Sequence, residues 1–209
     1  ASMKGPHVPG HARWIYASLY LRGLGRFEES AGEMARAAEE DPLNATWHAI
    51  WAAHLIDAQR VGEALDVARR STEIDPTYFL THNMVGEASW AAGLHDEALA
   101  AFERAHALAP WFGVATGWLA AIHRLAGREG VAEAFLAALG PTSKPLWGRV
   151  VYHLLTSELD AAADWYEQMI EERDPFALLY ARASAVAPLR DHHRWPTLAA
   201  RMKLPRMSP

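Results

Sequence analysis

Histidines are the residues of this chain best able to do chemistry, since there are eleven of them and no cysteine. His48 and His82 are separated by the same interval as Pro42 and Pro76, so neighbouring helices of a repeat would bring the two imidazoles together. Two imidazoles placed in this way are able to bind a transition metal. However, the chain has no HExxH motif, and no ligand set completes a four-coordinate zinc site. We therefore interpret His48 and His82 as packing residues and His192-His193 as a solvated loop pair, and we expect no metal and no cofactor.

Carboxylates gather in the stretch 158–174, and four of them share one face of an expected helix at three- and four-residue spacing. These four are Asp160, Asp164, Glu167 and Glu171. Catalytic acids need a dry setting that separates their pKa values, whereas a whole face of acids is typical of a solvated surface. We favour the solvated surface. The alternative is a docking strip for a basic partner, including the chain's own C-terminal tail.

The charge distribution bears on that alternative. From Arg182 onward the chain has six basic residues against one acidic residue, whereas the rest has 14 basic and 24 acidic residues. This asymmetry indicates complementarity within the chain rather than a nucleic-acid-binding arm. The net charge of −5 also disfavours nucleic acid as a partner.

Signatures of covalent catalysis are missing from the sequence. There is neither a cysteine nor a GxSxG serine motif. The glycines of 23–25 and 127–130 stand at expected turns between helices, where glycine permits a positive φ. With 51% hydrophobic residues the chain is able to bury a core, and no apolar run approaches the ~18–20 residues of a membrane span. We predict that the protein is not an enzyme.

The elements that position these residues follow from an internal repeat. Pro42, Pro76 and Pro110 recur at a constant interval, and that interval, about 34 residues, is typical of helical repeats. Small residues precede each proline by twelve positions (Ser30, Ala64, Ala98) and by five positions (Ala37, Ser71, Ala105). Gly25, Gln59 and Gly93 stand seventeen positions before the prolines. Small residues let two helices approach closely, and proline ends the second helix because its ring clashes with the preceding turn.

The segments between these markers have the spacing of helices. In 96–108 the residues Ala98, Leu99, Phe102 and Ala105 recur at three- and four-residue intervals and give one apolar face. The segments 61–74 and 27–38 behave similarly, and no strand-like alternation of useful length occurs. A unit of two helices buries its apolar face only against neighbouring units, so the pattern predicts an all-α solenoid.

At this point the chain resembles the tetratricopeptide repeat. The third unit carries the pattern best, with Gly86, Gly93, Ala98, Phe102, Ala105 and Pro110. The resemblance implies a right-handed superhelical α-solenoid of antiparallel hairpins, with about four or five repeats and a C-terminal capping helix. We place a scar and N-terminal extension at 1–10, the solenoid at 11–175, and capping helices and tail at 176–209. The expected units are 11–44, 45–78, 79–112, 113–142 and 143–175, and Gly140-Pro141 cuts the second helix of the fourth unit short.

The C-terminal stretch is similar to the tail of tetratricopeptide regions in large bacterial signalling proteins. The matching residues run through Glu171–Phe176, Ala187–His192, Trp195 and Leu198–Pro205. That resemblance implies a fragment of a larger signalling or regulatory protein, with a catalytic or DNA-binding domain upstream. The opening Ala1-Ser2-Met3 resembles a cloning scar.

In the tetratricopeptide family the first helix of each hairpin lines a concave groove. When the groove positions of the family are transferred to this sequence, the candidate partner-binding residues are Ile15, Leu19, Arg22, Ala49, Ala53, Ile56, Asn83, Glu87, Trp90, Ala121 and Arg124. Of the nine tryptophans, Trp14, Trp51 and Trp118 have expected core positions, whereas Trp90 has a groove position. Aromatic and arginine side chains are typical binding anchors. We therefore predict that Trp90 and Arg124 lie on the groove about one hairpin apart.

Three functions remain open at this stage. We favour a non-catalytic scaffold that binds a protein or peptide in the groove. The alternatives are a structural or self-association module, with a homodimer left open, and a small-molecule sensor near Trp90. The expected compartment is the cytoplasm, with an extracytoplasmic part of a membrane-anchored regulator as the alternative, and no membrane insertion is expected.

Overall fold

The computed structural model describes residues 8–140 and 146–204, and every regular element in these two ranges is helical. The chain divides into two compact units, Ala1–Ala101 (unit 1) and Phe102–Pro209 (unit 2). The boundary between them falls within helix α6 (His95–Leu108). The all-α prediction is therefore confirmed for the described residues.

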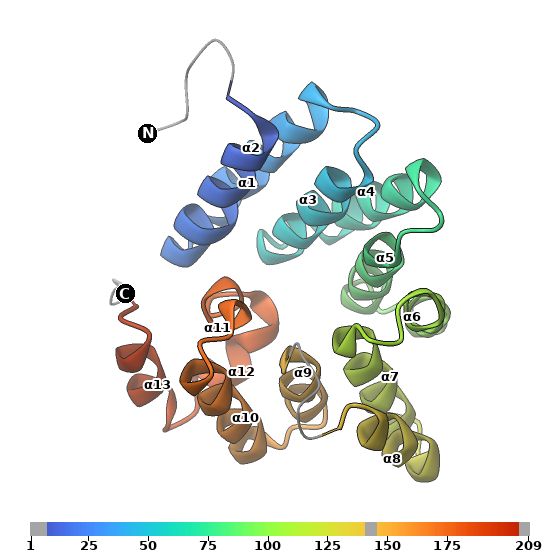
Figure 1. The fold of residues 1–209 in the computed structure, drawn as a ribbon, viewed down its shortest axis with the longest axis vertical. Coiled ribbons are helices and arrows are strands. Elements are labelled where there is room, and N and C mark those ends of the chain that lie inside the picture. Colours follow the sequence, from blue (N-terminus) through green and yellow to red (C-terminus); the bar gives the residue numbers. More distant parts are fainter. Residues whose placement is uncertain (1–7, 141–145, 205–209) are drawn as a thin grey trace. The chain divides into compact units, whose positions relative to one another are not determined.

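Unit 1 consists of consecutive antiparallel helix pairs (Figure 1). Its first helix is irregular, because the opening α-helical turns continue directly into a π-helical and then a 3-10 segment. The elements are α1 (Gly10–Ile15), η1 (Tyr16–Leu21), η2 (Arg22–Leu24), α2 (Phe27–Glu40), α3 (Ala45–Asp57), α4 (Val61–Ile74), α5 (Phe79–Ala91) and the first half of α6.

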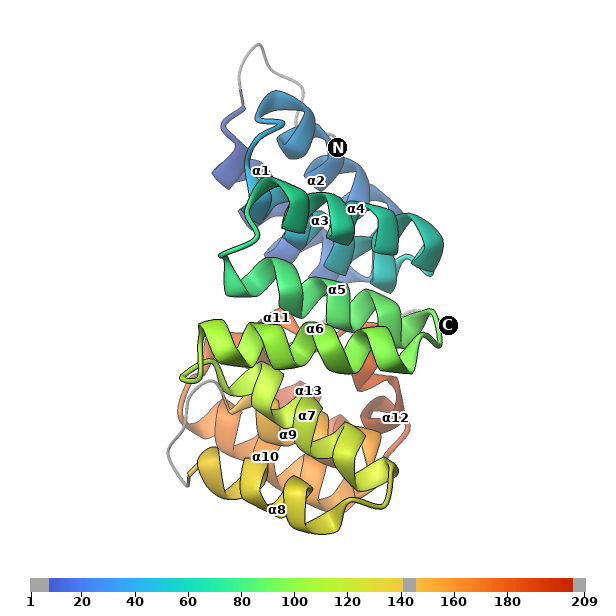
Figure 2. The same cartoon turned by 90° about the vertical axis from the view of Figure 1, so that its right-hand side faces the viewer.

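Unit 2 continues the helix pairs and ends in short helices packed on the last full-length one. Its elements are the second half of α6, α7 (Gly113–Leu125), α8 (Glu129–Ala138), α9 (Trp147–Leu155), α10 (Leu159–Glu171), α11 (Pro175–Leu179), η3 (Ser184–Val186), α12 (Ala187–Arg190) and α13 (Trp195–Arg201). In the second view, α8 lies in front of α9 and α10 (Figure 2). The short helices α11, α12 and α13 stand where the sequence predicts a capping helix.

The repeat period has a structural counterpart at the end of each first helix. Gly25, Gln59, Gly93 and Gly127 all have φ between 61° and 76°. At each of them the backbone makes the two hydrogen bonds of a Schellman motif, for example Gly25 N to Arg22 O and Arg26 N to Leu21 O, both 2.9 Å. In the fifth pair the equivalent residue is Ser157, which follows Gly127 at a shorter interval than the one between the earlier turns. The shortened first helix of the fifth pair, α9 with nine residues against thirteen in α7, accounts for that shift.

The second helices end where the prolines predict. Helices α2, α4 and α6 end at Glu40, Ile74 and Leu108, two residues before Pro42, Pro76 and Pro110. The predicted small residues Ser30, Ala64, Ala98, Ala37, Ser71 and Ala105 are all buried. Pro141, which belongs to the predicted break after α8, lies outside the described residues.

The core of unit 1 is built from small and aliphatic side chains of successive helices. One cluster joins Ala52 and Leu55 of α3, Ala64 and Ala68 of α4, and Ala88 of α5. All five side chains are fully buried. Close helix contacts of this kind bury apolar area without large side chains. They also determine which faces of the three helices point outward.

Unit 2 has an even closer helix contact. A methyl group added to Gly117 of α7 would come within 2.0 Å of the Gly148 carbonyl oxygen of α9, and one added to Gly148 would meet Gly113 at the same distance. The two glycines thus let α7 and α9 pack backbone against backbone. Beside them, the Phe102 and Trp118 rings stack at 4.8 Å.

Candidate functional site

The first helices of unit 1 are joined by polar contacts. Ser18 Oγ of η1 lies 3.0 Å from His54 Nε2 of α3, and Arg22 Nε of η2 donates to Asp57 Oδ2 of α3 at 2.5 Å. Helix α5 packs against α3 in turn. We give the name first-helix face to the nine predicted groove positions on these helices: Ile15, Leu19, Arg22, Ala49, Ala53, Ile56, Asn83, Glu87 and Trp90.

The Arg22–Asp57 ion pair is buried, with side chains only 6% and 3% exposed. A buried pair requires good geometry and further hydrogen bonds to offset the loss of hydration. The arginine predicted to contact a ligand is therefore engaged by an aspartate of its own chain, and only 5% of Arg22 is exposed.

Glu87 is the unusual titratable group of this face. Burial raises the pKa of Glu87 to about 7, and Asp57 acts in the same direction, whereas the hydrogen bond from Asn83 and the charge of Arg22 act against it. Asn83 Nδ2 donates to Glu87 Oε1 at 2.8 Å. Among the described residues the Glu87 carboxyl has no ion-pair partner, although the residue is half-buried. A cation brought to this carboxyl would stabilise its charged form.

An apolar hollow lies at one end of the face. Ile15 and Leu19 are 48% and 55% exposed, and with their neighbours they line a shallow space of about 630 Å³. The rings of Tyr16 and Tyr20 stack beside it at 5.3 Å. The complete lining is His11, Ala12, Ile15, Tyr16, Leu19 and Tyr20.

The middle of the face is less open than the sequence indicated. Ala53, Ile56 and Trp90 are half-buried, and the Trp90 ring packs on that of His95 at 4.5 Å. Trp90 is thus neither a core residue nor a fully exposed anchor, and removing its side chain will affect stability more than a surface substitution does.

Three predicted contact residues are corrected by their burial. Ala49 and Ala121 are fully buried and Asn83 is 1% exposed. Ala49 belongs to the core of unit 1 and Ala121 to that of unit 2. Neighbouring helices of the same unit cover Ala49 and Ala121, so these side chains do not offer a surface to a partner.

Arg124 lies in unit 2 and is exposed. Its guanidinium donates to Glu129 Oε1 at 2.7 Å, across the turn between α7 and α8. The predicted pairing of Arg124 with Trp90 of unit 1 stays a prediction.

His54 has a role that the sequence did not reveal. It is 2% exposed, and Ser18 Oγ and Ser30 Oγ lie 3.0 and 2.5 Å from its two ring nitrogens. Burial lowers the pKa of His54 well below its ordinary value, which favours the neutral form of the ring. It joins the first two hairpins. The sequence signal for this contact is a histidine on a buried helix together with two serines in the preceding repeat.

His48 and His82 support the packing interpretation. His48 Nδ1 lies 3.1 Å from Asn44 O, and His82 Nε2 lies 2.8 Å from Pro76 O. Each imidazole is thus bound to a backbone carbonyl close by in its own part of the chain, as expected for a packing residue.

The acidic face of α10 is not simply solvated. Arg194 Nη2 donates to Glu167 at 2.7 Å and Arg194 also pairs with Asp164. Arg201, on α13, pairs with Glu167 and Glu171. The face thus keeps the solvent exposure of the favoured interpretation, with Asp160, Asp164 and Glu171 between 60% and 83% exposed. It also pairs with arginines of the chain's own tail, as the alternative predicted.

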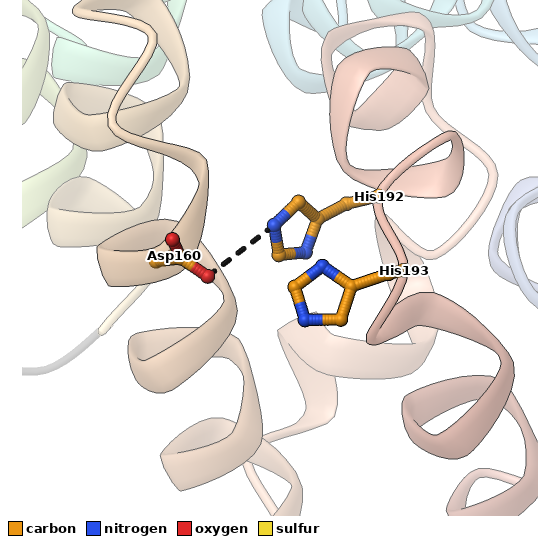
Figure 3. Close-up of side chains that lie close together, drawn as sticks. All are labelled: Asp160, His192 and His193. Carbon is orange, nitrogen blue, oxygen red and sulfur yellow. Dashed lines mark ion pairs between the residues drawn. The ribbon is translucent and has the colours of Figure 1, made fainter.

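One His/Asp group forms at the same place. Asp160 of α10 lies beside His192 and His193 of the turn between α12 and α13 (Figure 3), with ligand atoms of all three within 4.8 Å of one another. It is the group of three metal-ligating side chains found in the described part of the chain. The sequence analysis missed it because Asp160 lies far from the two histidines along the chain.

Consecutive helix pairs, with a common period in the first four and matching turns throughout, define the tetratricopeptide-repeat fold. No family model and no curated protein matches the chain, but solved structures share its architecture. A tetratricopeptide protein of Thermus thermophilus, TTC0263, is 21% identical over 85% of this chain and 98% of its own, with a TM-score of 0.62. The fold predicted from the repeat is confirmed.

Two further structures are similar. One is a tetratricopeptide repeat protein from Parabacteroides merdae, 14% identical over 94% of this chain and 80% of its own, with a TM-score of 0.52. The other is YrrB, described as a tetratricopeptide protein with an unusual peptide-binding site, 20% identical over 83% and 98%, with a TM-score of 0.50. In the described residues, none of the helices has the length and hydrophobicity to cross a membrane.

Proposed function

We propose that the chain is a non-catalytic scaffold that binds a protein or peptide segment on the first-helix face of unit 1. The observation that carries the proposal is the exposed apolar hollow at Ile15 and Leu19. Exposed aliphatic side chains around a depression are typical of a surface that a partner covers. The peptide-binding site named for YrrB supports the same use of this fold.

The chemistry of the face favours binding over catalysis. Arg22 is held by Asp57 and Asn83 is held by Glu87. These groups bind one another, whereas general acid–base catalysis needs a pair of groups that reach a reacting atom. We propose that recognition proceeds through shape and charge alone.

The same groups favour a particular kind of ligand. An apolar side chain would fill the hollow beside Leu19, and a lysine or arginine side chain would approach the Glu87 carboxyl. A charge-assisted hydrogen bond to a partly desolvated carboxylate is stronger than one at an open surface. We therefore favour a segment that carries both an apolar and a basic side chain.

The wider setting is part of the proposal. We propose that the chain acts within a larger bacterial signalling or regulatory protein, as its C-terminal resemblance implies, and in the cytoplasm. A self-association module is the second candidate, because the exposed Leu19 and Tyr20 would also suit a second copy of the chain.

A peptide-display selection tests the proposal. Peptides selected on the wild-type chain would be measured by isothermal calorimetry against Leu19→Ser, Ile15→Ser and Glu87→Gln. Leu43→Ser is the matched control, since Leu43 is 77% exposed but outside the first-helix face. We expect the face variants to weaken binding at least about tenfold, the loss of ~1.4 kcal/mol, and the control to leave it unchanged. Equal binding by all variants would contradict the proposed surface, and concentration-dependent dimerisation lost in Leu19→Ser would favour self-association.

A further inference from the structure

The C-terminal cap brings together two imidazoles and a carboxylate from separate parts of the chain. Asp160 lies in the first turn of α10, and His192 and His193 are consecutive residues of the turn after α12. The two imidazole rings lie 4.3 Å apart and on the same side of their turn, facing Asp160 (Figure 3). Imidazole and carboxylate are the ligands that zinc and its neighbours in the transition series take in proteins.

The separation of one pair of ligand atoms is compatible with a shared ion. His192 Nε2 lies 3.4 Å from Asp160 Oδ1. That distance is long for a hydrogen bond between a nitrogen and a carboxylate. In a tetrahedral zinc site with metal–ligand distances of about 2.0–2.2 Å, two ligand atoms lie about 3.3–3.6 Å apart.

A second observation concerns the other nitrogen of the same ring. The His192 side chain is 12% exposed, and its Nδ1 atom is buried without a hydrogen-bond partner among the described residues. Buried polar atoms nearly always have a partner, so an unsatisfied one requires an explanation. With Nε2 only loosely placed against Asp160, neither nitrogen of this largely buried imidazole is well satisfied within the chain.

The arginine of the same turn is engaged by carboxylates of α10. Arg194 Nη1 lies 3.4 Å from the Asp160 carbonyl oxygen, and its guanidinium is bound by Asp164 and Glu167. Asp191, also in this turn, is exposed. The carboxylates around the two histidines thus outnumber the arginine.

We propose that Asp160, His192 and His193 bind one divalent transition-metal ion of the zinc type, with water completing its coordination. The ion clamps the turn between α12 and α13 onto the start of α10, next to the ion pairs of Arg194 and Arg201. Because those ion pairs and the buried Tyr166, whose hydroxyl donates to Ala177 O at 2.6 Å, already hold the cap, the chain folds without the metal. The metal adds stability to the folded cap by binding it and not the unfolded chain.

The test uses the full chain after chelator treatment, titrated with zinc chloride by isothermal calorimetry and by thermal unfolding. We expect one saturable ion per chain and a rise in the melting temperature. Asp160→Asn is a conservative variant, because the Asp160 side chain is 83% exposed, and it should weaken binding by about tenfold or more, the scale seen for metal-site changes. His193→Ala should do the same.

Two matched controls make the result specific. Asp191→Asn removes an equal charge beside the same histidines, and His11→Ala removes an exposed histidine far along the sequence. Both should bind zinc as the wild type does, with the same rise in melting temperature. Binding that is absent in the wild type, or that survives equally in Asp160→Asn and His193→Ala, would overturn the proposal.

Discussion

Replacing Glu87 with glutamine should stabilise the protein, and by an amount that depends on pH. Burial raises the pKa of Glu87 from 4.5 to about 7 in the folded chain. As the pH rises, the unfolded chain therefore loses this proton first, and the folded state becomes less stable between about pH 4.5 and pH 7. Glutamine has no proton to lose and keeps an oxygen to accept from Asn83, which now donates at 2.8 Å.

The size of the effect follows from the pKa displacement. A change from 4.5 to about 7 corresponds to roughly 3 kcal/mol at about 1.4 kcal/mol for each pH unit. Because Glu87 is half-buried rather than fully buried, solvent reduces this, and we expect about 1–2 kcal/mol. Glu87→Gln should thus exceed the wild type by that amount at about pH 8 and match it near pH 4.5.

Urea unfolding followed by circular dichroism at several pH values measures the difference directly. The other titrating groups are common to both chains, so their contributions cancel. Glu39→Gln is the matched control, since Glu39 is exposed on α2, and its stability should stay within ~0.5 kcal/mol of wild type. A Glu87→Gln difference that is independent of pH, or that favours the wild type at high pH, would refute the assigned burial of this carboxyl.

Four further substitutions test the packing. Gly117→Ala should destabilise the protein by about 3 kcal/mol or more in thermal melts, because the added methyl group would meet the Gly148 carbonyl oxygen at 2.0 Å. Gly130→Ala is its control: Gly130 has open space around it, so this change should be neutral or stabilising by up to ~1 kcal/mol. Gln59→Gly should stabilise by roughly 0.5 kcal/mol in urea unfolding, because Gln59 has φ of 61°; a loss of stability would mean that its side chain contributes more than its backbone strain costs. His54→Ala should cost about 3 kcal/mol through the lost packing and the lost contacts to Ser18 and Ser30, of which Ser30 keeps its hydrogen bond to Ala17 O. A cost under ~1 kcal/mol would contradict the role of His54 in joining the hairpins.

The parts of the fold that depend on period were predictable from sequence. Pro42, Pro76 and Pro110 mark the ends of α2, α4 and α6 because proline is excluded from a helix interior. Gly25 and Gly93 mark the ends of first helices because they adopt a positive φ. These signals act within a few residues of chain, so a single sequence contains them in full.

Which residues of the first-helix face are exposed and which are buried could not be predicted from the repeat period. Ala49 and Ile56 belong to one expected groove, yet the first is fully buried and the second half-buried. The difference depends on how closely the next hairpin approaches, and the small core residues Ala64 and Ala88 set that approach. The period places a residue on a side of the helix, whereas burial depends on side chains one or two repeats away.

The acidic face of α10 shows that the charge pattern of a single helix does not decide whether its carboxylates are solvated or paired. Asp164, Glu167 and Glu171 at helical spacing are equally consistent with solvent and with a partner, since both keep charges hydrated or paired. The deciding information lies much later in the chain, in Arg194 and Arg201, which pair with these acids in the folded protein. Segregation of charge between a body and a tail was therefore a better guide than the helix pattern itself. Bringing that basic tail to α10 also carries His192 and His193 to Asp160, so the ion pairs assemble the metal-ligating group that no single segment contains.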